Sequence, residues 1–583
     1  NVVDDEPLTK HEYADAMAEA VGASPWIRSR GLLRPLAEVT ERRTGLAAWA
    51  VLPVLIAGGS LIVAVWGYYW DVSIHIDQGR DSGAFGNPAH WFIIAGLDGI
   101  AFAGLLALFL GDDRSGSAVR LRDRWSVPVG GILLTLCGAV ALAGFPLDDI
   151  WHRLFGQDVT AWGPTHIQMI AGASLSTIAC WVLIVEAERI GTPTRAGRAL
   201  LRFSDVALAG ALLVGLSTLQ VEFDYGVPQF RLLEHPVLIT VAASIALVAA
   251  RIRLGRGGAL AAVAFFLALR GALTLGVAAF DRIDFHFPLY VGSAVVIELV
   301  ALALKTDRTV RFGVAAGLGV ATAGFLSEWA WNRARMPIEW TSDLFPEVIP
   351  FVLVAGLAGG ALGGLAGRDL AGRSDPVPRG ALALGWLGVV AAIGLALPMD
   401  AEAARSAEIT VEPTGDGRAH LEVAMDPSDA GEDAAWFHVL TWQGSADGGP
   451  QGSAITELVR QEDGTYRTAE PVVIEGSAKT LIRFHRGDSL QSAPVYLPED
   501  EAIPAEAVPA ESGTERFVAD KVVLQREART DRAGLEKVAY AVLALIAAAW
   551  LATITWGLQR LGGRRRAKRE PTTARSPLQV QPT

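Results

Sequence analysis

Cysteine and methionine are scarce in this chain. Its 583 residues include two cysteines, Cys137 and Cys180, and five methionines. Both cysteines fall in apolar stretches, so the polar part of the chain has no disulfide framework and no thiolate cluster. A Walker motif is also absent, which argues against an ATPase. The opening residues, NVVDDEPLTKHEYADAM, lack a basic region followed by a short apolar core, so we expect no signal peptide there.

Long apolar blocks fill most of the chain. Hydrophobic residues make up 51% of it, and the mean hydropathy is +0.33. The blocks are about 20 residues long, enough to cross ~30 Å of hydrocarbon as helices. We predict an all-α polytopic membrane bundle of about twelve transmembrane helices built from repeated helix hairpins. The predicted spans lie near 45–67, 91–110, 127–146, 166–186, 204–222, 236–251, 258–279, 287–304, 312–329, 347–366, 380–398 and 537–558.

The charges alternate from one connection to the next. Arginine gathers in the connections after the second, fourth, sixth, eighth and tenth spans and in the tail RLGGRRRAKRE. By the positive-inside rule these segments and both termini are cytoplasmic, and the remaining loops face outward. The net charge of -12 reflects acidic outer segments and gives no support for nucleic-acid binding. The high alanine, glycine and arginine usage is typical of a GC-rich bacterium, so we expect a multi-pass protein of a bacterial cytoplasmic (inner) membrane, with the lipid bilayer as its surroundings.

A polar region interrupts the apolar blocks before the last span. Runs such as AEITVEP, AHLEVAM, WFHVLTW and KTLIRFH have strand-like alternation, which predicts an extracytoplasmic β-sandwich. Its histidines His420, His438 and His485, with Met425, are either scattered surface residues or a copper site, and the domain is equally suited to docking a partner. The expected divisions are 1–44, a cytoplasmic segment; 45–399, the bundle of five hairpins; 400–535, the β-rich domain; 536–559, the last helix; and 560–583, a basic tail.

The first two outer loops carry the same polar pattern. In each loop an aspartate and a histidine four residues apart end one helix, and a second histidine, two residues after a proline, opens the next helix. The two sets are Asp71, His75 and His90, and Asp148, His152 and His166. The third loop keeps a fragment, Glu222, Asp224, Glu234 and His235. The repetition indicates a duplicated hairpin whose outer loops gather over the centre of the bundle.

These two sets of side chains have two interpretations. An aspartate and a histidine four residues apart share one face of a helix and can hold one ion, and a histidine of the next helix closes the site. Imidazole and carboxylate together suit copper, zinc or iron, and the absence of thiolate argues against iron–sulfur clusters. The alternative is structural, because the same residues cap helix ends and form hydrogen-bonded pairs at a membrane interface.

The spacing resembles a known metal motif. An aspartate, a histidine four residues on and another histidine after the turn are similar to the metal site of the C subunit of copper membrane monooxygenases, the methane and ammonia monooxygenase family. Asp148, His152 and His166 would be the matching positions, with a turn slightly longer than the family's, and the turn of the first repeat is longer still. The resemblance implies copper, a redox reaction and other membrane subunits or an electron donor as partners. The family's C subunit is a shorter chain and lacks the β-rich domain.

Three charged residues fall inside predicted spans. Arg270 and Glu298 lie at similar depths in adjacent spans, so we expect them to form an ion pair. Asp98 has no obvious partner and is either a proton or ion relay beneath the outer loops or a hydrogen-bonding group between helices. The glycine-rich run AGLAGGALGGLAG predicts a close helix contact.

Four functions remain open at this point. The chain is a copper-dependent, monooxygenase-like oxidoreductase subunit, a copper handling or transport protein, a non-catalytic scaffold subunit of a larger membrane complex, or a transporter of another kind. The copper handling hypothesis requires ligands that continue inward, for which only Asp98, Met169, Cys137 and Cys180 are candidates.

Overall fold

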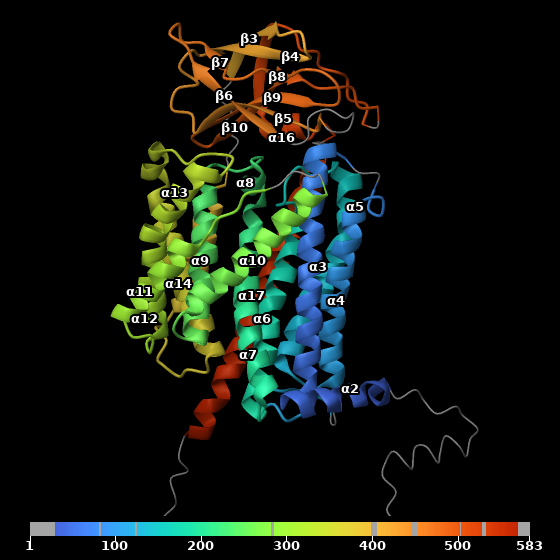
Figure 1. The fold of residues 1–583 in the computed structure, drawn as a ribbon, viewed down its shortest axis with the longest axis vertical. Helices are drawn as coiled ribbons and strands as arrows, with labels where there is room; N and C mark the ends of the chain where they lie inside the picture. The colour runs from blue at the N-terminus through green and yellow to red at the C-terminus, as the bar shows by residue number, and fades with distance from the viewer. Residues whose placement is uncertain are drawn as a thin grey trace, which may run out of the picture.

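A bundle of long helices carries a β domain at one end (Figure 1). The computed structural model describes residues 29–80, 83–122, 125–280, 285–397, 405–444, 453–501, 503–527 and 532–569. The first 28 residues, where we expect no signal peptide, and residues 570–583 of the basic tail lie outside the described residues. Helix α2 (Ser29–Thr44) lies across the end of the bundle opposite the β domain (Figure 1).

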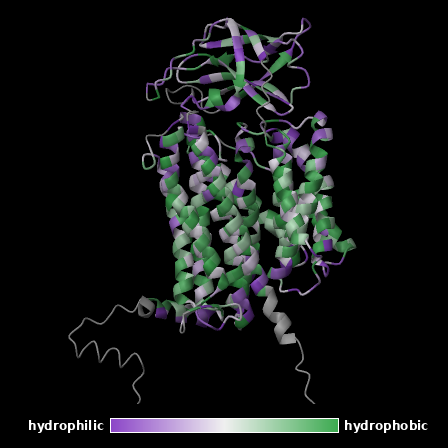
Figure 2. Cartoon of the chain, turned by 180° about the vertical axis from the view of Figure 1, so that it is seen from behind, coloured by the Kyte–Doolittle hydropathy of each residue, from purple (hydrophilic) through white to green (hydrophobic). Residues whose placement is uncertain are grey.

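Ten helical segments of the described residues are long and apolar enough to cross a membrane. Their apolar middles and polar ends are visible in Figure 2. The bundle therefore has the character of a multi-pass membrane protein. The segments comprise α3 (Ala48–Gln78), α4 (Pro88–Leu110), α5 (Val129–Phe155), α6 (Pro164–Ile190), α7 with α8 (Arg195–Tyr225), α9 (Glu234–Leu254), α10 (Gly258–Ala279), α12 with α13 (Thr309–Arg335), α14 with its preceding turn (Ser342–Leu370) and most of α17 (Gly534–Leu561).

Two of the twelve predicted spans correspond to shorter helices, α11 (Val291–Ala303) and α15 (Ala381–Gly394). Before α11, residues 285–290 run without helix, although Phe285 and Tyr290 are buried. The carboxylate of Glu328 accepts hydrogen bonds from the amides of Leu289, at 3.1 Å, and Tyr290, at 2.6 Å. Buried backbone amides need such acceptors in an apolar setting, so Glu328 allows α11 to begin inside the bundle.

The strands of the β domain close into a barrel. The order is β3-β11-β10-β9-β5-β6-β7-β4, with β8 beside β4, and β4 also pairs with β3, which completes the ring. The sandwich expected from the sequence is therefore not the arrangement found, since strand alternation predicts a buried face but not how a sheet closes. The strands are β3 (Arg405–Pro413), β4 (Arg418–Asp426), β5 (Trp436–Trp442), β6 (Ala454–Arg460), β7 (Tyr466–Thr468), β8 (Val472–Val473), β9 (Lys479–Arg486), β10 (Ser489–Tyr496) and β11 (Gly513–Ala519).

The glycine-rich run forms a close contact between α12 (Thr309–Gly319) and α14 (Phe345–Leu370). A methyl group added at Gly356 would meet the backbone oxygen of Gly317, and one added at Gly360 would meet that of Gly313. The two backbones approach too closely for any other residue at these positions. This contact agrees with the packing role predicted from the sequence.

The predicted ion pair between Arg270 and Glu298 is wrong. Arg270 pairs with Asp224, at the end of α8 (Val221–Tyr225). Glu298 instead pairs with Arg251 at 2.7 Å and accepts the amide of Gly257 at 3.0 Å. The sequence placed Glu298 too close to the β domain. Helix α11 begins at Val291, later than the predicted start of its span, so Glu298 lies at the end of the bundle opposite the β domain.

Asp98 lies on the outer surface of α4, where it is exposed rather than enclosed by other helices. It lines neither of the two cavities described below. This position argues against a proton or ion relay beneath the outer loops. Among the described residues, no hydrogen bond joins Asp98 to another helix.

Candidate metal sites

Two helix hairpins present the two predicted sets of side chains at the β-domain end of the bundle. Asp71 and His75 lie in the last turns of α3, and His90 lies in the first turn of α4. The hairpin of α5 and α6 places Asp148, His152 and His166 in the same way. Because both helices that carry the aspartates continue past these residues, the four-residue spacing brings each carboxylate and histidine onto one face.

Each set forms a compact group, which we call the first site (Asp71, His75 and His90) and the second site (Asp148, His152 and His166). In each site one donor atom per residue lies within 4.8 Å of the others. The sequence prediction that the three residues of each loop come together is thus confirmed.

The distances within the sites match those between ligands of one ion. In the first site, Oδ1 of Asp71 lies 3.4 Å from Nε2 of His75 and 3.1 Å from Nε2 of His90. In the second site, Nε2 of His152 lies 3.8 Å from Oδ2 of Asp148, and Nε2 of His166 lies 3.3 Å from Oδ1 of the same residue. Ligand atoms that surround one ion tetrahedrally at about 2.0 to 2.1 Å are roughly 3.3 Å from one another.

Backbone carbonyls orient the second histidine of each site. Nδ1 of His90 lies 2.8 Å from the oxygen of Ala84, and Nδ1 of His166 lies 2.9 Å from the oxygen of Thr160. A carbonyl oxygen only accepts hydrogen bonds, so Nδ1 carries a proton and Nε2 is the ring atom that faces the carboxylate. Two acceptors approach this closely when a proton or a metal ion lies between them. A carbonyl behind a ligating histidine is a recurrent feature of metal sites.

Each aspartate also accepts a hydrogen bond from a nearby side chain. The side-chain amide of Asn87 donates to Oδ1 of Asp71 at 2.6 Å, and the hydroxyl of Thr165 donates to Oδ1 of Asp148 at 2.5 Å. Sequence reasoning did not identify these two residues. Their signal was nevertheless present, because each is adjacent to the proline that opens the returning helix.

Both sites face a single cavity of about 620 Å³, which we call the chamber. The β domain closes it from above with Leu440, Trp442 and Lys479. Gln443, which follows β5, donates its backbone amide to the oxygen of Ile76 at 3.2 Å and so ties the β domain to α3. Phe145 of α5 reaches the first site, where its ring meets that of His90 edge to face at 5.7 Å.

Acidic groups form part of the chamber wall. Asp158, in the loop between α5 and α6, accepts a hydrogen bond from the indole of Trp151 at 2.8 Å, and burial raises the pKa of its carboxyl to about 6. Glu222 accepts hydrogen bonds from the hydroxyl of Thr160 at 2.6 Å and the amide of Gln229 at 2.6 Å. Glu222 therefore orders the loop that supplies the carbonyl behind His166, rather than acting as a ligand.

Arg80 closes the edge of the chamber. Its guanidinium pairs with Asp500 at 2.9 Å and with Glu527 at 3.2 Å, which join the connection after α3 to two segments near the β domain. The positive charge of Arg80 is thus compensated by two carboxylates. The chamber is enclosed by parts of the chain that are far apart in sequence.

The remaining predicted histidines do not form a third group of this kind within the described residues. His235 accepts the indole of Trp340 at 3.1 Å and stacks on Phe223. His438 and His485 are 4% and 2% exposed, so they are not surface residues, while His420 lies on another strand, next to Thr468. A copper site formed by the histidines of the β domain therefore gains no support.

Comparisons with protein-family models, with curated proteins and with solved structures found no match to this chain. The resemblance to the C subunit of copper membrane monooxygenases therefore stays a hypothesis that rests on the residues of the two sites.

Proposed function

We propose that this chain is a multi-pass membrane metalloprotein that holds two transition-metal ions in the chamber. The observation that carries the proposal is the repeated geometry: two aspartate-histidine-histidine groups, each with hydrogen bonds that orient its ligands, face one cavity. Two protonated rings within 4.8 Å of each other repel, whereas a metal ion binds both Nε2 lone pairs and the carboxylate at once. Three protein ligands leave coordination positions open toward the chamber, as in catalytic sites.

The ligand chemistry favours copper, with zinc or iron as the alternatives. Imidazole suits all three metals, and the affinity of a nitrogen and oxygen site for divalent ions is highest for copper in the general order of divalent metals. Open positions on two ions in one chamber suit a reaction of a small molecule with oxygen or with water. We infer a monooxygenase-like oxidoreductase subunit that receives electrons from a partner.

The copper handling alternative has less support. It requires ligands that lead away from the sites through the bundle. Met169 lines the chamber, but Asp98 lies on the outer surface, and the free Cys137 and Cys180 are buried without lining the chamber. Among the described residues no continuous series of ligands leaves the chamber.

The arrangement of arginines supports an orientation with the chamber on the outer side of a bacterial cytoplasmic membrane. Arginine-rich connections such as those after α4, α6 and α9 gather at the end opposite the β domain, where Arg189 donates to the oxygen of Leu561 at 2.6 Å and Arg253 pairs with Asp205 at 3.0 Å. Positive charge of this kind remains in the cytoplasm. The chamber and the β domain then lie outside.

A partner subunit in the membrane is favoured by the position of Asp98. A carboxylate near the middle of a span costs at least ~2.5 kcal/mol when it faces lipid. Asp98 is exposed on α4 together with Trp91 and Phe102, which are each 55% exposed. We infer that another membrane chain covers this face and provides a polar partner for Asp98.

The proposal is tested by metal analysis of the protein purified in mild detergent or lipid nanodiscs. We expect close to two ions per chain by mass spectrometry, and close to one after the double change His152→Ala and His166→Ala or the change of His75 and His90 to alanine. His420→Ala changes a histidine of the barrel outside the two sites and should leave both ions bound. A wild-type protein without metal, or variants with unchanged metal content, would contradict the proposal.

A further inference from the structure

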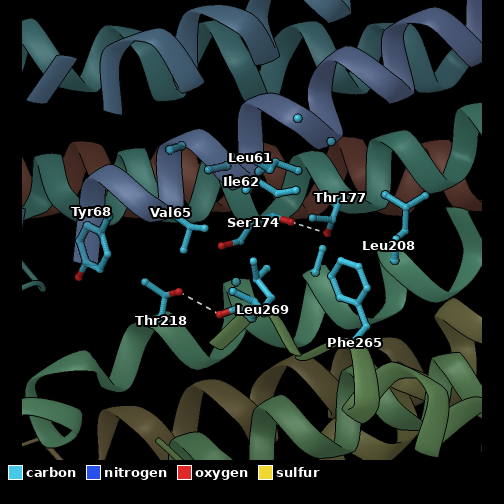
Figure 3. Close-up of a pocket in the computed structure, with 18 of the residues that line it drawn as sticks. Leu61, Ile62, Val65, Tyr68, Ser174, Thr177, Leu208, Thr218, Phe265 and Leu269 are labelled. Carbon is cyan, nitrogen blue, oxygen red and sulfur yellow. Dashed lines mark hydrogen bonds between the residues drawn. The ribbon is translucent and has the colours of Figure 1, made fainter. Parts of the chain in front are cut away.

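A second cavity, of about 270 Å³, runs through the helices below the chamber. We call it the slot. Its walls come from α3, α6, α7 (Arg195–Ser217) and α10, with Ile93 and Leu97 of α4, and Figure 3 shows side chains turned toward the open space. Tyr68 marks one end of the view, and Leu208 and Phe265 lie near the other. The slot is separate from the metal sites but lies in the same half of the bundle.

The slot is elongated along the helices. Its lining extends along α3 from Val54 to Tyr68 and along α7 from Phe203 to Val214 and beyond. Fourteen residues of helix cover about 21 Å at 1.5 Å per residue, which is roughly two thirds of the hydrocarbon thickness. A cavity of this shape fits an extended chain better than a compact molecule.

The lining of the slot is almost entirely apolar. Three of its five hydroxyl groups are already used: Ser174, Thr177 and Thr218 donate to backbone oxygens at 2.7, 2.6 and 2.9 Å. An occupant therefore finds no free donor along most of the slot. Hydrocarbon is the chemistry that such a wall accepts.

The slot has a mouth on the outer surface of the bundle. Leu55, Ile62 and Phe203 line it and are 52%, 48% and 64% exposed. In a membrane this surface faces the acyl chains of the lipid. An apolar chain can therefore enter from the bilayer without crossing water.

The slot and the chamber meet at a neck formed by Tyr68, Ile93, Met169 and Ile170, which line both cavities. The hydroxyl of Tyr68 is buried and has no hydrogen-bond partner among the described residues. Tyr68 precedes Asp71 by one turn of α3 and lies on the same face, so this unused donor stands beside the first site. The neck thus offers a polar group at the point where an apolar passage opens into a polar chamber.

We propose that the slot and the chamber together bind one single-chain membrane amphiphile, with its hydrocarbon chain in the slot and an oxygen-bearing head at the metal sites. The change from apolar to polar lining at the neck matches the two parts of such a molecule. The hydroxyl of Tyr68 hydrogen-bonds the head, and the open coordination positions receive its oxygen. The head contact rests on the proposed metal function, whereas occupation of the slot does not.

Two glycines allow a sharp test. A β-carbon at Gly58, which lines the slot on α3, would meet nothing within 4 Å, so Gly58→Leu can extend a side chain into the slot from an unobstructed position. Gly271 of α10 is equally half-buried and equally free of neighbours, but it lines neither cavity. Gly271→Leu is therefore the matched control for helix stability and membrane insertion.

The experiment uses hexadecanoic acid with a diazirine in the middle of its chain, and the full-length protein in lipid nanodiscs. After illumination we expect labelled peptides from α3, α6 and α7, at least fivefold less label in Gly58→Leu, and unchanged label in Gly271→Leu. Unlabelled hexadecanoate should displace the probe at least tenfold better than hexadecane, and Tyr68→Phe should reduce that preference. Equal labelling of the two leucine variants would overturn occupation of the slot.

Metal content measured in the same samples separates the two proposals. Metal that remains bound in Gly58→Leu, together with lost labelling, supports the amphiphile and leaves the sites intact. Labelling that is lost equally in both leucine variants while metal stays bound overturns the amphiphile only. Hexadecane that competes as well as hexadecanoate overturns the head contact, and a wild-type protein without metal overturns the proposed function independently of the slot.

Discussion

The Nε2 atom of His166 lies 3.3 Å from Oδ1 of Asp148. The other nitrogen of the same ring lies 2.9 Å from a carbonyl oxygen, so the ring is oriented from behind and faces the carboxylate. His90 stands in the same relation to Asp71, at 3.1 Å. This repetition makes the second site a direct place to test which groups bind metal.

The change Asp148→Asn should empty the second site. Asparagine has nearly the same shape and still accepts the hydroxyl of Thr165, but it lacks the negative charge that binds a cation. We expect the affinity of this site to fall by more than the roughly 10- to 100-fold typical of changes to surrounding contacts. Metal titration followed by mass spectrometry measures the loss. Asp149→Asn is the control, because the adjacent Asp149 pairs with Arg153 at 2.7 Å instead. Equal metal loss in both variants would argue against Asp148 as a ligand.

Thr165→Val should weaken the same site without removing a ligand. The hydroxyl of Thr165 holds Asp148 at 2.5 Å, and valine keeps the shape of threonine but cannot donate. We expect roughly 10- to 100-fold lower metal affinity, as for other contacts that orient a ligand. Thr165→Ser retains a hydroxyl and should restore most of the affinity. If valine and serine have the same effect, the loss comes from packing and not from the hydrogen bond.

Sequence spacing was sufficient to identify both sites, because a four-residue interval on a helix places two side chains together whatever surrounds them. The third ligand of each site followed from the repeat, which linked His90 and His166 to the same position of a hairpin. The hydrogen bonds behind the ligands were not predictable in this way. The carbonyl behind His166 belongs to Thr160, and its position depends on Glu222, a residue of α8.

The errors in the fold have a common physical origin. Closure of the barrel requires β3 to pair with β4 as well as with β11. The alternation of apolar and polar residues along these strands does not show which strands pair. The predicted partner of Arg270 was wrong because α11, which carries Glu298, begins inside the bundle. Glu328 allows this start by accepting the amide of Tyr290, and hydropathy does not reveal such a contact. In both cases the decisive contact joins segments far apart in the chain. The expected orientation in the membrane and the number of spans stay predictions.

The stability of the β domain should fall as the pH falls. Burial, with the nearby positive charge of Arg483, lowers the pKa of His438 to about 3, and burial also lowers that of His485 to about 3. In the unfolded chain the pKa of histidine is close to 6.5, so between pH 6.5 and 3 the unfolded state binds more protons than the folded state. Its free energy of unfolding therefore rises with pH across this range and is greatest above it.

Thermal unfolding monitored by tryptophan fluorescence between pH 7.5 and 4.5 measures this effect. The unfolding temperature should drop at low pH, and it should drop less in His438→Gln, which removes one of the two groups. His420→Gln changes a histidine on a different strand and should follow the wild type. A pH dependence that is the same in all three proteins would show that the buried histidines are not its source.

The buried pair of Arg270 and Asp224 should contribute to the stability of the bundle. Arg270 is fully buried, pairs with Asp224, and lies over the ring of Tyr69 at 4.2 Å. Removing one partner of a buried pair leaves the other charge without compensation, which costs about 3 to 5 kcal/mol. Asp224→Leu should therefore lower the free energy of unfolding by about this amount.

The double change Asp224→Leu with Arg270→Met removes both charges and should recover most of the loss, because apolar residues of similar volume often replace such a pair without cost. Unfolding in a denaturing detergent measures both variants. If the double variant is as unstable as the single one, the side chains matter through packing and hydrogen bonds rather than through their charges.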